Sequence, residues 1–208
     1  TETGPQVIRA ETVIIATGSS PVELPFMPFG GNVISSTEAL ALKSLPATMA
    51  VVGGGYIGLE LGIAFAKLGT KITVVEAESR ILPQYDAELT RPVAKRLADL
   101  GVTVMTGVKA KGVTSKGDAL RIETASGDEQ KIEAEKILVT VGRKPLVEGW
   151  GLEELDLDRV GKFIKIDDQC RTSMRGVYAI GDVTGEPMLA HRAMAQGEMV
   201  AEIVAGHK

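Results

Sequence analysis

The stretch that decides the fold is Met49-Ala50-Val51-Val52-Gly53-Gly54-Gly55-Tyr56-Ile57-Gly58-Leu59-Glu60. An apolar run leads into three consecutive glycines, and apolar residues then recur at helical spacing up to Leu68. The pattern predicts a strand that ends at Gly53, a sharp turn, and a helix whose first backbone N–H groups face an anion. We therefore expect a pocket for the pyrophosphate of a dinucleotide.

Three glycines of this stretch have separate expected roles. Gly53 permits the tight turn, Gly55 lets the backbone approach the phosphate, and Gly58 lets the helix pack closely on the strand. The alternative is a glycine-rich turn that only reverses the chain. The expected dinucleotide contacts are Gly53, Gly54, Gly55, Tyr56, Ile57, Gly58, Leu59 and Glu60.

A carboxylate follows the next predicted strand, about 20 residues beyond the glycines, as the dinucleotide fold requires. Glu76 at this place can accept hydrogen bonds from a free ribose hydroxyl but repels a 2′-phosphate, which predicts NAD rather than NADP. Arg80 is the nearest cation, but Glu78 lies between the two, so we expect Arg80 to be a solvated charge. The alternative for Glu76 is an ordinary surface carboxylate.

Composition places the chain in the soluble globular class. It has 208 residues, 44% hydrophobic and 24% charged, enough for one or two domains. A net charge of −4 without basic runs gives no reason to expect nucleic acid. No apolar stretch approaches the roughly 18 residues that span a bilayer, and residues 1 to 10 lack the layout of a secretion signal, so we expect a cytoplasmic protein without a membrane partner.

The chain has a single cysteine, Cys170, and two histidines, His191 and His207. One cysteine excludes an intrachain disulfide, and these three residues offer no plausible zinc cluster, so no metal is expected. Cys170 is interpreted as an inert packing residue. The alternative, a reactive thiol, needs an exposed and electropositive setting.

Elements alternate in the central part of the chain, which is typical of a doubly wound α/β sheet. The expected order of strand, helix, strand, helix and strand is Met49–Val52, Gly58–Lys67, Lys71–Val75, Asp86–Leu100 and Val102–Met105. An antiparallel meander is expected at Lys109–Thr114, Ala119–Thr124 and Gln130–Ala134, followed by a buried strand at Lys136–Val141. Outside this part we expect a fully buried parallel strand at Val13–Ala16, strands at Phe163–Ile166 and Val177–Ile180, and a helix from about Leu189 to Val204.

The stretch from Thr172 to Asp182 resembles the second flavin motif of the two-dinucleotide flavoprotein disulfide reductases, the class I pyridine nucleotide-disulfide oxidoreductase family. Residues 16–19 resemble the segment where the chain leaves the flavin domain, residues 141–145 the segment where it returns, and residues 188–191 the flavin-ring contact. Within that family the motifs are most similar to the dihydrolipoyl dehydrogenases, in residues 53–60, in Ile81-Leu82-Pro83 with Asp86, and in residues 190–198.

The resemblance implies an FAD/NAD(P)-binding Rossmann-like doubly wound domain with an antiparallel meander, plus partial flavin-domain segments. Residues 1–22 would end the first FAD segment, residues 23–145 would form the NAD-binding domain, and residues 146–208 the central FAD segment. The implied cofactors are NAD and FAD. The implied flavin contacts are Thr17, Gly18, Ser19, Asp182, Met188, Leu189, Ala190 and His191. The resemblance also adds Ala110 and Gly142 to the expected NAD contacts.

Several of these implied contacts have a simpler alternative. Asp182 would accept from the ribityl hydroxyls of FAD, or serve only as a cap or turn residue. His191 is more easily a structural residue at a helix start than a base. Ala110 lies in a variable meander, where an alanine can be mere packing, and Glu60 can be an ordinary exposed helical carboxylate.

In a parent enzyme, the resemblance implies that dihydrolipoamide carried on the lipoyl domains of 2-oxoacid dehydrogenase complexes reduces a disulfide, and that the electrons pass through FAD to NAD⁺. This chain lacks the family's first glycine fingerprint, its C-x-x-x-x-C pair and its His–Glu pair. We therefore expect a central fragment with no catalytic residue, inactive alone, of a homodimeric parent. The alternatives are another reductase of this family, of the glutathione or mercuric type, and a non-catalytic NAD-sensing module.

Overall fold

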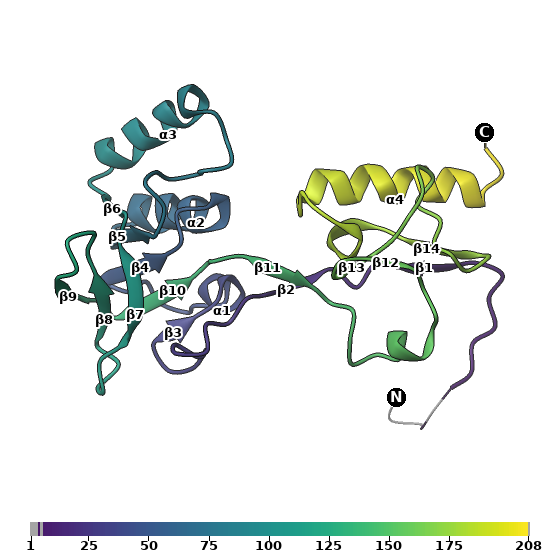
Figure 1. Cartoon of the computed structure of the whole chain (residues 1–208), viewed down its shortest axis with the longest axis horizontal. Coiled ribbons are helices and arrows are strands. Elements are labelled where there is room, and N and C mark those ends of the chain that lie inside the picture. The colour runs from purple at the N-terminus through teal and green to yellow at the C-terminus, as the bar shows by residue number, and fades with distance from the viewer. Residues whose placement is uncertain (1–3, 5, 208) are drawn as a thin grey trace. The chain divides into compact units, whose positions relative to one another are not determined.

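The computed structural model describes residue 4 and residues 6–207, which divide into two compact units. One unit comprises Pro21–Arg143, and the other comprises the residues before Pro21 together with those from Lys144 onward (Figure 1). None of the helices in this described part combines the length and apolar character that crossing a bilayer needs.

The central unit is built on a five-stranded parallel sheet. The strand order is β3-β10-β4-β5-β6, so the strands of the glycine motif lie inside the sheet. The bounds are β3 Val33–Ile34, β10 Lys136–Val139, β4 Thr48–Val52, β5 Lys71–Glu76 and β6 Thr103–Thr106. This arrangement confirms the predicted parallel α/β sheet.

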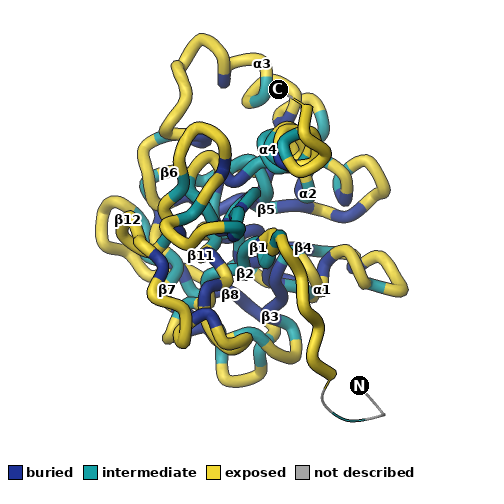
Figure 2. The backbone as a smooth tube through the Cα atoms, turned by 90° about the vertical axis from the view of Figure 1, so that its right-hand side faces the viewer, coloured by how far each residue is buried: buried dark blue, intermediate teal, exposed yellow. Residues whose placement is uncertain are grey.

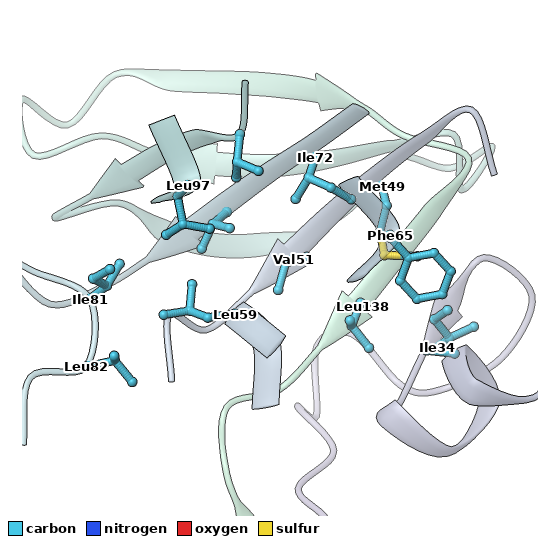
Figure 3. Close-up of a cluster of buried hydrophobic side chains, with 13 residues drawn as sticks. Ile34, Met49, Val51, Leu59, Phe65, Ile72, Ile81, Leu82, Leu97 and Leu138 are labelled. Atoms are coloured by element: carbon cyan, nitrogen blue, oxygen red, sulfur yellow. The ribbon is translucent and has the colours of Figure 1, made fainter. Parts of the chain in front are cut away.

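Both faces of this sheet are covered, which explains why the interior strands β4 and β10 read as nearly continuous apolar runs. Because successive side chains of a strand point to opposite faces, Met49 and Val51 enter one core, whereas Ala50 and Val52 enter the other. The first core packs against the helices, and Figure 3 shows its side chains gathered between strands and helices. The second core packs against the meander.

Three helices belong to the central unit: α1 Ser36–Leu40, α2 Tyr56–Lys67 and α3 Ala87–Asp99. Ser35 and Glu38 form a capping box at the start of α1. Asp86 caps α3 by accepting from the Glu88 N–H at 2.9 Å. Among the residues of α3, only Thr90 and Leu97 are buried, and Figure 2 shows most of this helix exposed.

The meander is the predicted three-stranded antiparallel sheet. Its strands are β7 Lys109–Val113, β8 Ala119–Glu123 and β9 Glu129–Glu133, in the order β7-β8-β9. A bulge lies between Ala110 and Gly112. Leu120 and Ile122 of the middle strand are almost fully buried and carry the meander's side of the second core.

The other unit contains a two-stranded parallel sheet and one long helix. Strand β1 (Val13–Ile15) pairs with β14 (Val177–Ala179), and helix α4 covers Ala190–Val204. The unit also contains the antiparallel pair β12 Arg159–Val160 and β13 Phe163–Ile164, and the 3₁₀ helices η1 Leu152–Glu154 and η2 Gly181–Thr184. A separate core holds Ile15, Val147, Leu152, Leu157, Ile164, Val177, Ala179 and Val183.

The prediction of a fully buried strand at Val13–Ala16 is wrong in one respect. The strand is parallel as expected, but Val13 and Ile14 are exposed and only Ile15 is buried. In the described residues β1 pairs with β14 alone, so a strand apolar on both faces lacks the neighbours that would cover it. The two short connecting strands β2 (Ser19–Pro21) and β11 (Arg143–Pro145), which pair with each other, were not predicted.

Candidate functional site

The turn after β4 has a conformation that requires glycine. Gly53 has φ +105°, in the left-handed region, and its N–H donates to the Val75 carbonyl at 2.9 Å. A Cβ on Gly53 would lie 2.6 Å from the carbonyl oxygen of Thr140. Position 53 therefore requires a residue without a side chain, because the chain turns sharply there and passes close to the residue that follows β10.

Helix α2 begins almost in contact with the sheet. A Cβ on Gly58 would lie 2.4 Å from the Gly53 carbonyl oxygen, 2.5 Å from Thr140 Oγ1 and 3.0 Å from Val51 Cγ1. Such distances are well inside van der Waals contact, so Gly58 allows the helix to lie this close to β4. Helix α2 starts two residues earlier than expected, because Gly55 serves as its N-cap.

The N-terminus of α2 has no side-chain cap, and the space beside it is open. Gly55 caps the helix with its backbone only, and a Cβ built on it would meet no atom within 4 Å. A helix start of this kind presents N–H groups and the positive end of the helix dipole to an anion. This helix start around Gly55, called here the cradle, fits the diphosphate of a dinucleotide, because residues beyond the chain neighbours of Gly55 leave the space beside it open.

Glu76 ends β5 and holds the glycine turn. The residue is 8% exposed; Oε2 accepts from the Gly54 N–H at 2.6 Å, and Oε1 accepts from the Glu78 N–H at 2.7 Å. Each carboxylate oxygen has a second lone pair, so Glu76 can accept further hydrogen bonds. Glu76 is thus a buried carboxylate next to the turn, and the alternative of an ordinary surface carboxylate does not describe it.

Arg80 differs from its prediction as a solvated charge. It is partly buried, its Nη2 donates to the Pro83 carbonyl at 2.7 Å, and its Nη1 has no solvent exposure and no partner among the described residues. The guanidinium lies against the turn after β5 because Pro83 offers it an acceptor three residues along the chain.

The other residues expected on the NAD side lie in varied settings. Glu60 is exposed on α2, and Gly142 is exposed with φ +135° a few residues beyond β10. Ala110 lies in β7 and packs, partly buried, against the second core. Contacts of these three residues with a cofactor stay predictions.

The residues expected on the flavin side gather at the ends of β1 and β14. The Ser19 hydroxyl donates to Asp182 Oδ2 at 2.5 Å, and Thr17 Oγ1 donates to the Leu146 carbonyl at 2.8 Å. Gly18 lies between them with φ +71°. At the start of α4, Met188 is buried, Leu189 is partly buried, and Ala190 and His191 are exposed.

Arg192 of α4 fixes the turn that carries Asp182, a role that the sequence did not indicate. Its Nη1 donates to the Gly185 carbonyl at 2.9 Å and to the Gly181 carbonyl at 3.3 Å, and its Nη2 donates to Thr184 Oγ1 at 2.9 Å. An arginine fork on two carbonyls and a hydroxyl holds a short 3₁₀ turn in one conformation.

Cys170 is buried, with φ +60°. Burial is the main cause that raises the pKa of its thiol, with a smaller opposing effect from Arg192. This setting fits the predicted packing role rather than a reactive thiol. The described residues contain no group of three or more His, Cys, Asp or Glu side chains that could hold a metal ion.

A groove in the central unit lies apart from the glycine turn. It is lined by the first residues of β4 and β10, Thr48 and Lys136, and by Lys116, Asp118 and Lys131 of the meander. The glycine turn follows the last residue of β4, at the opposite edge of the sheet. The groove is therefore not a part of the candidate dinucleotide site.

Two residues of the site were not assigned a role from the sequence. Thr140, just after β10, donates through Oγ1 to the Val52 carbonyl at 3.1 Å and the Gly53 carbonyl at 3.3 Å. Leu82 donates through its N–H to the Gly54 carbonyl at 2.9 Å. No local sequence pattern indicates a role for Thr140. Leu82 belongs to the family-like motif Ile81-Leu82-Pro83, but the sequence alone does not indicate what this motif contacts.

The family model described as "Pyridine nucleotide-disulphide oxidoreductase" matches residues 1–197. A dihydrolipoyl dehydrogenase of Pseudomonas aeruginosa is 59% identical over 205 residues, which are 99% of this chain and 44% of that protein. The chain therefore spans less than half the length of this relative.

Two solved structures have the same fold over almost the whole chain. LpdA from Mycobacterium tuberculosis superposes with a TM-score of 0.82 at 31% identity, covering 96% of this chain and 43% of that one. The HOCl-induced flavoprotein disulfide reductase RclA from Escherichia coli superposes with a TM-score of 0.84 at 26% identity, covering 97% and 46%.

Proposed function

This chain belongs to the pyridine nucleotide-disulphide oxidoreductase family, and on that premise we propose that residues 23–145 are the NAD-binding domain of a dihydrolipoyl dehydrogenase. Members of this family use FAD and NAD(P). Residues 1–22 and 146–208 are proposed as the two flavin-domain segments on either side. The proposal of a dihydrolipoyl dehydrogenase parent draws on the 59% identical relative.

The observation that supports NAD most directly is the pairing of Glu76 with the glycine turn. A carboxylate on a residue that is 8% exposed, already bonded to the Gly54 N–H, is held in one place beside the cradle. A fixed carboxylate there can accept from the 2′- and 3′-hydroxyls of the adenosine ribose and repels a phosphate in the same position. The neighbouring cation, Arg80, donates through Nη2 to the Pro83 carbonyl at 2.7 Å.

The residues of the cradle would bind and orient the dinucleotide. The backbone around Gly55 would meet the diphosphate, Glu76 the adenosine ribose, and Glu60, one turn into α2, would lie toward the nicotinamide. Bound there, NAD⁺ supplies the two-electron acceptor of the overall reaction. The contribution of this chain is to hold the cofactor in a fixed orientation.

The flavin side is proposed on the residues that the fold brings together. Asp182, which accepts from the Ser19 hydroxyl, would also accept from FAD hydroxyls, and the start of α4 near Leu189 would present backbone N–H groups to the flavin ring. Bound FAD supplies electron transfer between thiol and nicotinamide chemistry. The cytoplasmic location, the homodimeric parent and its lipoyl-domain partners stay predictions.

The cofactor preference is tested by calorimetric titration of the 208-residue chain with NADH and NADPH. We expect NADH to bind at least tenfold more tightly. The Glu76→Arg variant should narrow or reverse that ratio, because a cation replaces the carboxylate beside the ribose. Glu78→Arg is the matched control, since it makes the same charge change at an exposed neighbour and should leave the ratio within about twofold.

The ratio of the two affinities is the informative quantity, because damage to the turn weakens both cofactors together. Equal affinities for the unaltered chain, or a preference for NADPH, would remove the NAD assignment and favour an NADPH-dependent reductase of the same family. The parent activity needs a separate test. A full-length protein that contains this chain should reduce NAD⁺ with dihydrolipoamide.

A further inference from the structure

We propose that the segment Arg80–Tyr85, called here the support loop, sets the orientation of the Gly54–Gly55 peptide and thereby directs the Gly55 N–H toward the cofactor diphosphate. Within the support loop, Leu82 contacts this peptide through its backbone N–H. The inference deepens the proposed NAD site and rests on it. It assigns a positioning role to residues that have no expected contact with the cofactor themselves.

Hydrogen bonds hold the glycine turn on both sides of Gly54. The Leu82 N–H donates to the Gly54 carbonyl at 2.9 Å, and the Gly54 N–H donates to Glu76 Oε2 at 2.6 Å. The Gly53 carbonyl accepts from Thr140 Oγ1 at 3.3 Å. Both peptide groups that flank Gly54 are thus fixed from the protein side.

Peptide geometry sets the direction of the Gly55 N–H. In the described residues the one cis peptide is Glu186–Pro187, so the Gly54–Gly55 peptide is trans. The C=O and N–H of a planar trans peptide point in opposite directions. Because Leu82 holds the Gly54 carbonyl, the Gly55 N–H must point away from the support loop. A Cβ on Gly55 would meet nothing within 4 Å, so the surrounding space is open to an anion.

The backbone conformation of Leu82 is unusual. It has φ +49°, a left-handed value that a leucine rarely adopts, and its side chain is buried in the first core. Figure 3 shows Ile81 and Leu82 beside Leu59 of α2. A residue stays in such a conformation only when its surroundings determine it, and residues of this kind gather at ligand clamps.

The support loop is itself held by two further hydrogen bonds. Arg80 Nη2 donates to the Pro83 carbonyl at 2.7 Å, and the Tyr85 N–H donates to the Leu82 carbonyl at 3.0 Å. A Cβ on Gly54 would lie 3.1 Å from Ile81 Cγ2, so the loop also packs directly on the turn. Arg80 therefore stabilises the support loop through its hydrogen bond to Pro83, a role that involves no phosphate.

Two substitutions separate backbone positioning from simple packing. Leu82→Gly removes a buried side chain but adopts a positive φ freely, so the amide can keep its bond to Gly54. Leu82→Val keeps most of the apolar volume but strongly disfavours a positive φ, so the amide should turn away. We expect Leu82→Gly to bind NADH at least fivefold more tightly than Leu82→Val. A role in packing alone predicts the reverse order.

The titrations are made on the 208-residue chain, at a temperature where circular dichroism shows both variants folded. If Leu82→Val does not fold, Leu82→Gly is compared with Leu82→Ala, which differs from it by a single Cβ, and at least a twofold advantage for glycine is expected. Equal affinities within the pair, or a weaker Leu82→Gly, would overturn the inference.

Amide hydrogen exchange followed by NMR gives a readout without cofactor. The amide at position 82 should be protected in the unaltered chain and unprotected in Leu82→Val, whereas the Gly55 amide should exchange rapidly in the unaltered chain. An unaltered chain that does not bind NADH would remove the proposed function and this inference together. An unaltered chain that binds NADH while its position-82 amide exchanges rapidly would remove the inference alone.

Discussion

Gly58→Ala places one methyl group at the closest contact between α2 and the sheet. The added Cβ would lie 2.4 Å from the Gly53 carbonyl oxygen and 2.5 Å from Thr140 Oγ1. The first of these atoms belongs to the backbone of the turn, and the second is bonded to the Val52 and Gly53 carbonyls. Neither can move without disturbing the cradle, so the start of α2 must move away from β4.

The expected magnitude combines two opposing effects. Overpacking of a well-packed core costs about 1–3 kcal/mol, and contact with backbone places this case near the upper value. Alanine is preferred to glycine inside a helix by about 1 kcal/mol. The net loss in the free energy of unfolding is therefore about 2 kcal/mol. Displacement of the turn should also weaken NADH binding at least tenfold.

Gly62→Ala is a control on the same helix. Its Cβ would meet Ile72 Cγ2 at 3.6 Å and Val51 Cγ2 at 3.9 Å, which are ordinary contact distances. This variant gains the helix preference without the overlap, so it should be more stable than the unaltered chain by about 0.5–1 kcal/mol. Urea unfolding followed by circular dichroism measures both changes, and calorimetry measures NADH affinity.

If Gly58→Ala were as stable as Gly62→Ala and bound NADH equally well, the close approach of α2 to the sheet would not need a glycine at this position. That result would mean that the turn and helix can separate without loss, and that the glycine at position 58 has no steric purpose. A loss of stability with unchanged NADH affinity would refute only the link between the packing of α2 and the position of the cradle.

Two further predictions concern groups with a shifted pKa. Hydrogen bonds from the side chain and backbone of Ser35 lower the pKa of Glu38, so its stabilising effect is present above the ordinary glutamate pKa and is lost as the pH falls through the lower folded value. The excess stability of the unaltered chain over Glu38→Ala should therefore shrink in urea titrations below about pH 4, the ordinary range of a glutamate, and an excess independent of pH would contradict this. Because Cys170 is buried and its thiol pKa is raised, it should react with a thiol reagent at pH 8 only after unfolding by urea; rapid labelling of the folded chain would show that it is accessible.

Much of the central unit was predictable because its signals are local. The apolar runs at Met49–Val52 and in the later strands of the sheet indicate buried parallel strands. The spacing of Gly53 and Gly58 indicates a tight turn followed by a helix that packs closely on the sheet. Both patterns depend on residues a few positions apart. The burial of Val13 and Ile14 was predicted wrongly, since exposure depends on which strands lie beside β1 rather than on the strand itself.

The sequence by itself determined the alternation of strands and helices, the position of the glycine turn, and a carboxylate at the end of the second strand, because each follows from periodicity and from the conformations that glycine permits. Only the tertiary structure decided which groups hold the turn. Thr140 reaches Gly53 from the residue just after β10, and Leu82 reaches Gly54 from the loop after β5. Hydrogen bonds between residues so far apart along the chain arise from the order of strands in the sheet and from a left-handed leucine, and no short pattern of residues encodes either one.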